Sequence, residues 1–211
     1  MQSACAQAGL WHDDAPAGRH VGLWINVSPV QFGNERLVDD LAVAITSARI
    51  DPQQVTVEVT ESSVIRDARQ STETLHRLRS LGVSVSIDDF GTGYSSLSRL
   101  GELPIDMLKI PKPFVDRLAG DSLDGSIVDA ILRLASSLGL TVVAEGAETQ
   151  EQVDRLQELG CALVQGNVFG RAESADDTLR FLRHWTPPVP TPPARTRTTR
   201  TRSTRAPSKP S

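Results

Sequence analysis

The sequence predicts an α/β fold, a TIM-like (β/α) barrel of parallel strands. Two observations favour this fold. Short runs rich in Val and Ile alternate with longer segments whose apolar residues recur at helical spacing. Each of these runs also ends in a polar or charged residue, as at the functional face of a barrel.

The composition predicts one folded domain over residues 1–186 and a disordered tail over residues 187–211. The chain has 211 residues, of which 39% are hydrophobic, and this is enough for one buried core. The tail is rich in Pro, Thr, Ser and Arg and carries six positive charges and no acid. Subtracting these six charges from the net charge of −4 leaves the body at −10, which disfavours nucleic-acid binding.

No stretch approaches the roughly 18 consecutive apolar residues of a membrane span, and the N-terminus does not resemble a signal peptide. A cytoplasmic protein is therefore expected. Cys5 and Cys161 lie far apart and have no metal-ligand spacing around them. We expect both to be free thiols, with Cys161 buried.

Six strands and six helices are expected in alternation. The strands are predicted at residues 21–27, 55–59, 83–87, 106–110, 141–144 and 162–164. The helices are predicted near residues 35–48, 71–80, 95–101, 123–138, 149–159 and 175–184. Such alternation indicates parallel strands joined by crossover helices.

An open doubly wound sheet is the alternative to a barrel, and periodicity alone does not separate the two. A dinucleotide-binding sheet has a Gly-rich turn after its first strand. Here Val27 is followed by Ser28, Pro29 and Val30. Gly91 and Gly93 do follow a strand, but they lack the rest of that pattern. The barrel is therefore favoured.

The polar residues at the strand ends form the candidate site. Read in chain order, these residues are Asn26, Glu58, Asp88 with Asp89, Lys109, Glu145 and Gln165. Burying several carboxylates close together is costly unless cations or protons relieve their repulsion. Converging carboxylates with an amide oxygen suit Mg²⁺ or Mn²⁺.

Hard divalent ions beside a lysine favour phosphoryl chemistry over the alternatives. Zinc is disfavoured because no histidine lies at a strand end. Glycoside hydrolysis also uses paired carboxylates, but sugar clefts are usually lined by aromatic residues, which make up only 4% of this chain. Trp24, within the first predicted strand, is expected to be a packing residue rather than a ligand-stacking one.

These motifs, in this order, resemble the EAL-domain family of cyclic di-GMP phosphodiesterases from about residue 3 to residue 171. The most specific motif is SIDDFGTGYSSL at residues 86–97. It is supported by NVS at 26–28, EVTES at 58–62, LPID at 103–106, LKI at 108–110, AEGAE at 144–148 and QG at 165–166.

The resemblance implies a role for each strand-end residue. Asn26, Glu58 and Asp88 would bind one metal ion, and Asp88, Asp89 and Glu145 would surround a second. Lys109 would position the attacking water and stabilise charge on the phosphate, and Gln165 would hold a metal-bound water or Glu145. Glu61 would brace the loop after Asp89. That loop shapes the second metal site and a homodimer contact in the family.

The resemblance also implies the substrate, cyclic di-GMP, which family members cut to linear pGpG with two Mg²⁺ or Mn²⁺ ions. The family's first strand carries the Glu-Ala-Leu motif, and this sequence contains no counterpart. The barrel is therefore expected to be incomplete at its N-terminus and short of one metal-ligand glutamate. Pro111 also replaces the usual aspartate.

Two functions follow from this comparison. The first is a cyclic di-GMP phosphodiesterase whose activity is limited by the missing strand. The second is a degenerate module that binds cyclic di-GMP or a protein partner without cleavage. An upstream sensor or GGDEF-type domain is expected if the chain is part of a longer protein.

Overall fold

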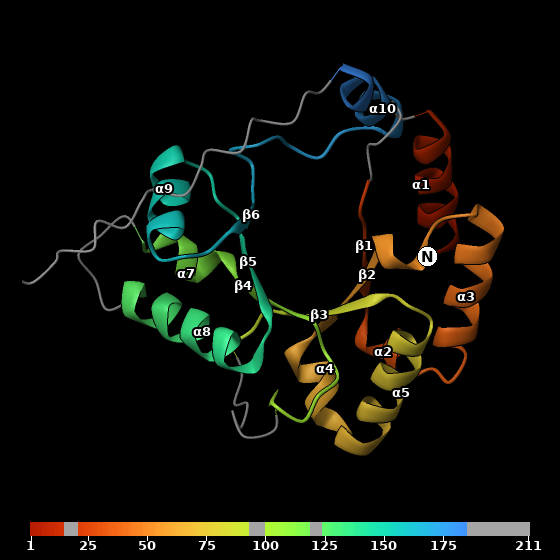
Figure 1. Ribbon diagram of the computed structural model, residues 1–211, viewed down its shortest axis with the longest axis horizontal. Helices are drawn as coiled ribbons and strands as arrows, with labels where there is room; N and C mark the ends of the chain where they lie inside the picture. The colour runs from red at the N-terminus through yellow and green to blue at the C-terminus, as the bar shows by residue number, and fades with distance from the viewer. Residues whose placement is uncertain (15–20, 93–99, 119–123, 185–211) are drawn as a thin grey trace, which may run out of the picture.

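The computed structural model describes residues 1–14, 21–92, 100–118 and 124–184. They form a six-stranded parallel sheet in the order β1-β2-β3-β4-β5-β6 (Figure 1). The strands are β1 (Leu23–Val27), β2 (Val55–Thr60), β3 (Ser84–Asp88), β4 (Met107–Ile110), β5 (Thr141–Glu145) and β6 (Leu163–Gln165). Each strand pairs with the next one in sequence, as a β/α barrel requires.

Alternation along β2 and β3 sends apolar residues outward and polar residues inward. In β2, Val55, Val57 and Val59 are fully buried in the hydrophobic core. Thr56 and Glu58 lie between them and therefore point to the opposite face. In-register pairing of parallel strands preserves this pattern across the sheet, so the polar residues share the inner face.

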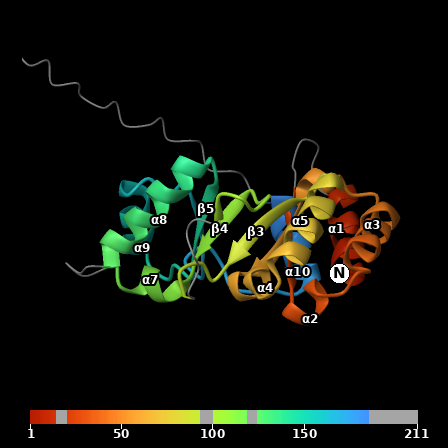
Figure 2. The ribbon, with the colours of Figure 1, turned by 90° about the horizontal axis from the view of Figure 1, so that it is seen from below.

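Helices cover the outer face of the sheet in two groups, one beside β1 to β3 and one beside β4 to β6 (Figures 1 and 2). The first group contains α1 (Gln2–Asp14), α2 (Pro29–Phe32), α3 (Leu37–Ala48), α4 (Glu61–Arg66) and α5 (Ala68–Ser80). The second group contains α7 (Lys112–Asp116), α8 (Asp124–Leu138) and α9 (Gln150–Glu158). Their apolar sides pack on the outward residues of the strands and form the core.

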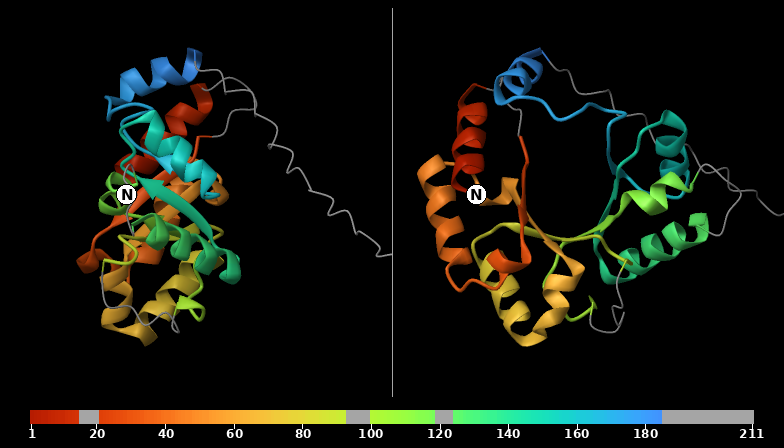
Figure 3. Two further views of the ribbon diagram at one scale, coloured as in Figure 1. Left: turned by 90° about the vertical axis from the view of Figure 1, so that its left-hand side faces the viewer. Right: turned by 180° about the vertical axis from the view of Figure 1, so that it is seen from behind.

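The sheet curls into an open barrel rather than a closed one (Figure 3). β1 and β6 are the two edges of the sheet and do not pair with each other. The segment that follows β6 crosses the open side, and the helix at its end, α10 (Ala175–His184), lies beside α1 (Figure 3). The Trp11 indole Nε1–H of α1 donates to the Ala175 carbonyl oxygen at 3.2 Å. The first and last helices of the described chain therefore lie side by side, next to the β1 edge.

The predicted fold class is confirmed: the chain is α/β and forms an incomplete TIM-like barrel. The six strands and five of the expected helices are present, with shifts of a few residues at their ends. Helices α1, α2, α4 and α7 were not among those expected from the pattern; they have 13, four, six and five residues, respectively. Most of the expected helix 95–101 and all of the tail, 187–211, lie outside the described residues. No described helix is long and apolar enough to cross a bilayer.

Candidate functional site

Lys109 of β4 lies at the centre of three carboxylates on the inner face. Its Nζ is 2.5 Å from Glu58 Oε1 of β2 and 3.8 Å from Asp88 Oδ1 of β3. It also forms an ion pair with Glu145 of β5. Only 4% of the Lys109 and Glu58 side chains is exposed, whereas Asp88 and Glu145 are about a fifth exposed. The cluster therefore opens to solvent on the Asp88 and Glu145 side.

Burial and charge act in opposite directions on these groups. Burial alone lowers the pKa of Lys109, but hydrogen bonds and charge from Glu145 and Glu58 outweigh it and raise that pKa above its ordinary value. Burial raises the pKa of Glu145, and Lys109 partly opposes this rise. Lys109 is therefore held as an ammonium ion, while Glu145 takes up a proton more readily than an exposed glutamate.

Asn26 and Gln165 lie at the two ends of the same row of strand ends. Asn26 of β1 is the register partner of Glu58, and Gln165 of β6 is the register partner of Glu145. Both side chains are exposed, because β1 and β6 are the open edges of the barrel. The fold thus brings together residues from all six strands, with the charged cluster in the middle and the two amides at the edges.

Trp24 of β1 corrects one expectation. It was predicted to be a packing aromatic, but it is 38% exposed and lies on the inner face, two residues before Asn26. Lys109 Nζ lies 5.9 Å from the centroid of its ring, within range of a cation–π contact. The alternation of Trp24 with the buried Ile25 and Val27 was the signal in the sequence that indicated the inner face.

The buried side chain of Glu61 holds the loop after β3. The Gly91 N–H donates to Glu61 Oε2 at 2.8 Å, and Glu61 itself is buried at the start of α4. The Asp89 N–H donates to Asp88 Oδ1 at 2.9 Å. Asp89 has φ of 56° and an exposed side chain, so it lies at the rim of the cluster. The next part of this loop, 93–99, lies outside the described residues.

The loops after β5 and β6 each require glycine at their first position. Gly146 has φ of 75°, which disfavours other residues, and it directly follows Glu145. A Cβ atom on Gly166 would lie 2.0 Å from the Ala147 carbonyl oxygen. This close approach allows the Ala147 N–H to donate to the Gln165 carbonyl oxygen at 3.2 Å. The loops that carry Glu145 and Gln165 are therefore locked together.

The donor set fits a hard divalent cation by its chemistry. Asn26, Glu58 and Asp88 offer only oxygen ligands from three adjacent strands. Ser86, the register partner of Glu58, is fully buried, and its hydroxyl has no hydrogen-bond partner in the described structure. Within the described part of the chain, no group of three or more His, Cys, Asp or Glu side chains is arranged to hold a metal ion, and the Lys109 ammonium forms ion pairs with Glu58 and Glu145.

Comparison with known proteins identifies relatives over most of the chain. The family model described as "EAL domain" matches residues 1–172. The bifunctional diguanylate cyclase/cyclic di-GMP phosphodiesterase MucR of Pseudomonas aeruginosa is 43% identical over 179 residues, which are 85% of this chain and 26% of MucR. The solved MucR phosphodiesterase in complex with cyclic di-GMP superposes with a TM-score of 0.79 at 42% identity, covering 84% of this chain and 71% of that chain.

Two further relatives extend the comparison. The cyclic di-GMP phosphodiesterase RocR of Pseudomonas aeruginosa is 38% identical over 157 residues, which are 74% of this chain and 40% of RocR. BlrP1 of Klebsiella pneumoniae, solved with manganese and cyclic di-GMP, has a TM-score of 0.72 at 37% identity, covering 81% of this chain and 42% of that chain. The chain therefore spans well under half the length of the MucR and RocR proteins.

Proposed function

We propose that this chain, which belongs to the EAL domain family, hydrolyses one phosphodiester bond of cyclic di-GMP to give linear pGpG. The observation that carries the proposal is the buried Lys109 ammonium among the Glu58, Asp88 and Glu145 carboxylates at the mouth of the half-barrel. The relatives named for this activity support the choice of substrate.

We further propose that two Mg²⁺ or Mn²⁺ ions bind at the strand ends. Asn26, Glu58 and Asp88 would hold one ion, and Asp88, Asp89 and Glu145 would hold the other. Bound divalent ions lower the pKa of a coordinated water and neutralise phosphate charge. The manganese in the BlrP1 complex supports a divalent ion in a relative with the same fold.

The chain's own residues then have separate tasks. Lys109, whose charge is secured by its carboxylate neighbours, stabilises the negative charge that develops on the phosphate oxygens and orients the attacking water. Glu145, with its raised pKa and partly open side chain, is suited to accept a proton from that water. Gln165 orients Glu145 across the strand pair, and Glu61 holds the loop that carries Asp89.

A binding module without turnover is the second candidate, and one observation favours it. The Lys109 ammonium offsets part of the negative charge of the three carboxylates, so the cluster depends less on a metal ion than three carboxylates alone would. Such a module would bind cyclic di-GMP or a protein partner. Calorimetric titration with cyclic di-GMP, with and without Mn²⁺, separates the two candidates when it is combined with product analysis.

The deciding experiment measures pGpG formation by the purified chain with Mg²⁺, Mn²⁺ or a chelator. We expect product only with a divalent ion, and a loss of more than about 100-fold in Glu58→Gln and Glu145→Gln. The matched control is Arg133→Met, which removes an exposed charge on α8 far from the cluster. No product from a chain that binds cyclic di-GMP tightly would favour the binding module. Turnover restored only by an upstream extension would show that a further strand completes the site.

The wider context of the chain is also proposed. Because MucR and RocR are longer than the matched region, we propose that the chain works beside a sensor or GGDEF-type domain in the cytoplasm. We propose a homodimer through the loop after Asp89. Size-exclusion chromatography with light scattering tests the dimer, and the variant Glu61→Ala, which releases Gly91, tests the loop.

A further inference from the structure

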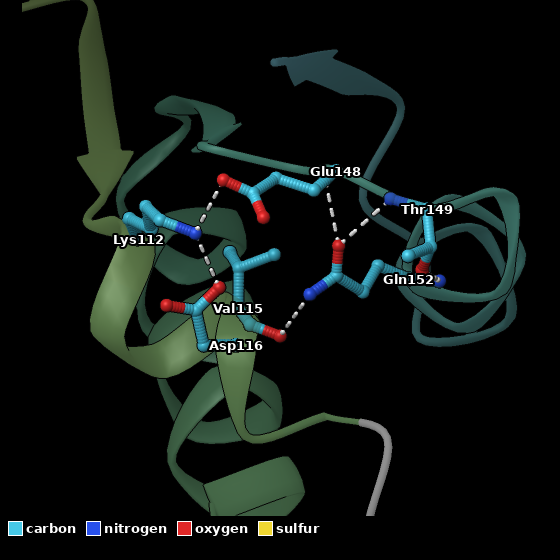
Figure 4. A network of polar contacts seen from close by, with 6 residues as sticks. All are labelled: Lys112, Val115, Asp116, Glu148, Thr149 and Gln152. Carbon is cyan, nitrogen blue, oxygen red and sulfur yellow. Dashed lines mark hydrogen bonds and ion pairs between the residues drawn. The ribbon is translucent and has the colours of Figure 1, made fainter. Parts of the chain in front are cut away.

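A second cluster of charged residues lies just after β4 and β5, three residues beyond the first cluster in each segment. Lys112 is three residues after Lys109, and Glu148 is three residues after Glu145. Lys112 Nζ lies 3.1 Å from Glu148 Oε1, so the same two chain segments are joined twice by Lys–Glu pairs (Figure 4). Asp116, one turn along α7, holds Lys112 Nζ at 2.6 Å.

The stem of Lys112 packs over the turn that follows Glu145. A Cβ atom on Gly146 would lie 2.6 Å from both Cβ and Cγ of Lys112. The methylene groups of Lys112 therefore cover the backbone of Gly146, whose φ of 75° sets the direction in which the chain leaves β5. Lys112 thus contacts this loop through its stem and through its ammonium group.

Gln152 adds a separate connection between the same two segments. Its Oε1 accepts hydrogen bonds from the N–H groups of Glu148 and Thr149 at 2.7 and 3.1 Å. Its Nε2 donates to the Val115 carbonyl oxygen of α7 at 3.5 Å (Figure 4). Gln152 is buried, so it fixes the far end of the loop, whereas Lys112 acts at the end that adjoins Glu145.

We infer that Lys112 is a positioning residue for the reaction, because it fastens the loop after Glu145 to α7 and so fixes Glu145 relative to Lys109. Only the expected effect of Lys112 on turnover rests on the proposed function. The packing of Lys112 on Gly146 and its pair with Glu148 exist whether or not the chain is an enzyme. Small displacements of a catalytic group lower kcat without a matching change in substrate binding.

The test compares Lys112→Met, Lys112→Arg and Arg133→Met in the full chain. Lys112→Met keeps an unbranched stem over Gly146 and removes the charge, and Lys112→Arg restores a charge. Arg133→Met removes an exposed i,i+4 pair with Asp129, in which the Arg133 side chain is 79% exposed against 44% for Lys112. We expect Lys112→Met to lower kcat about fivefold with KM within about twofold, Lys112→Arg to recover most of the loss, and Arg133→Met to change neither.

Hydrogen exchange of the amides at Ala147 and Glu148 provides a readout that does not need turnover. We expect Lys112→Met to speed their exchange about tenfold, while the urea midpoint of unfolding stays that of the parent. Unchanged exchange with unchanged kcat in Lys112→Met would overturn the inference. If the parent chain forms no pGpG, the proposed function fails, and the exchange comparison still decides whether Lys112 fastens the loop.

Discussion

The two lysine clusters differ in burial far more than in geometry. Lys109 pairs with carboxylates of three strands and Lys112 with carboxylates of two segments, and each joins the β4 side of the barrel to the β5 side. The Lys109 side chain is 4% exposed, whereas that of Lys112 is 44% exposed. Water screens the ion pairs of Lys112, which we call the outer cluster, whereas the ion pairs of Lys109, the inner cluster, lie in a low-dielectric environment.

This difference in burial gives the ion pairs of Lys109 and those of Lys112 different roles. An exposed pair contributes about 0–1 kcal/mol and can set the position of a loop without strongly affecting folding. A buried pair is costly to break, because one partner is left charged and desolvated. The inner cluster should therefore govern both stability and chemistry, and the outer cluster should govern geometry alone.

The largest expected effect comes from Lys109→Met. Loss of the ammonium leaves Glu58, Asp88 and Glu145 with unrelieved repulsion, so we expect the free energy of unfolding to fall by about 3–5 kcal/mol in metal-free buffer near neutral pH. Urea unfolding monitored by circular dichroism measures this change. We also expect loss of pGpG formation by more than about 100-fold.

Two conditions should reduce the stability loss in Lys109→Met. Millimolar Mn²⁺ supplies positive charge to the carboxylates, and acidic buffer protonates Glu145, whose pKa burial already raises. The folded-state pKa of Glu145 lies above its unfolded value, so its share of the deficit shrinks as the pH falls through that pKa. A variant as stable as the parent in neutral, metal-free buffer would show that the inner pairs do not govern folding.

The residues at the strand ends could be predicted from the sequence, but the position of the Lys109 ammonium among them could not. Val/Ile runs ending in Asn26, Glu58, Asp88, Lys109 and Glu145 predicted both the sheet and the membership of the site. The position of the Lys109 ammonium depends on rotamers and on the curl of the sheet, which no local pattern reports.

Other features depended on contacts that are distant in sequence. Of the short helices, α2 has a local capping box formed by Ser28, whereas α4 and α7 have no side-chain cap at their N-termini, and periodicity indicated none of the three. The cover that Lys112 forms over Gly146 joins residues 34 positions apart, so only the three-dimensional structure shows it. In the sequence, Gly146 indicated a turn, but it did not indicate that Lys112 packs on that turn.

Glu61→Ala is expected to have the next largest effect. Its buried carboxylate accepts the Gly91 N–H, and the substitution leaves that donor without this partner and a cavity beside it. We expect a loss of about 1–3 kcal/mol in the free energy of unfolding and faster hydrogen exchange at Gly91. Glu61→Gln keeps an acceptor oxygen and serves as the control, with a smaller loss. Equal stability of Glu61→Ala and the parent would contradict the bracing role of Glu61.

Gly146→Ala should cost less in stability and should act on the outer cluster. The new Cβ atom meets Lys112 at 2.6 Å, and alanine disfavours φ of 75°. We expect a loss of about 1–2 kcal/mol by urea unfolding and lower kcat, since the turn after Glu145 must shift. Gly139→Ala is the control: φ there is 69° and open space surrounds the site, so it measures the backbone strain alone. If Gly146→Ala lowers the free energy of unfolding no more than Gly139→Ala does, the packing of Lys112 on residue 146 contributes nothing to the loss.

Arg77→Met should have the smallest effect and sets the baseline for an exposed pair with no part in the site. Arg77 Nη2 of α5 lies 3.2 Å from Asp39 Oδ1 of α3, and the two side chains are 44% and 74% exposed. We expect a double-mutant cycle with Asp39→Asn to give a coupling energy of about 0.2–0.5 kcal/mol, and kcat within about twofold of the parent. The Lys112–Glu148 pair should show a similarly small coupling in stability but a measurable coupling in kcat. If both pairs couple equally in kcat, then exposure alone, and not contact with the loop after Glu145, explains what Lys112 does.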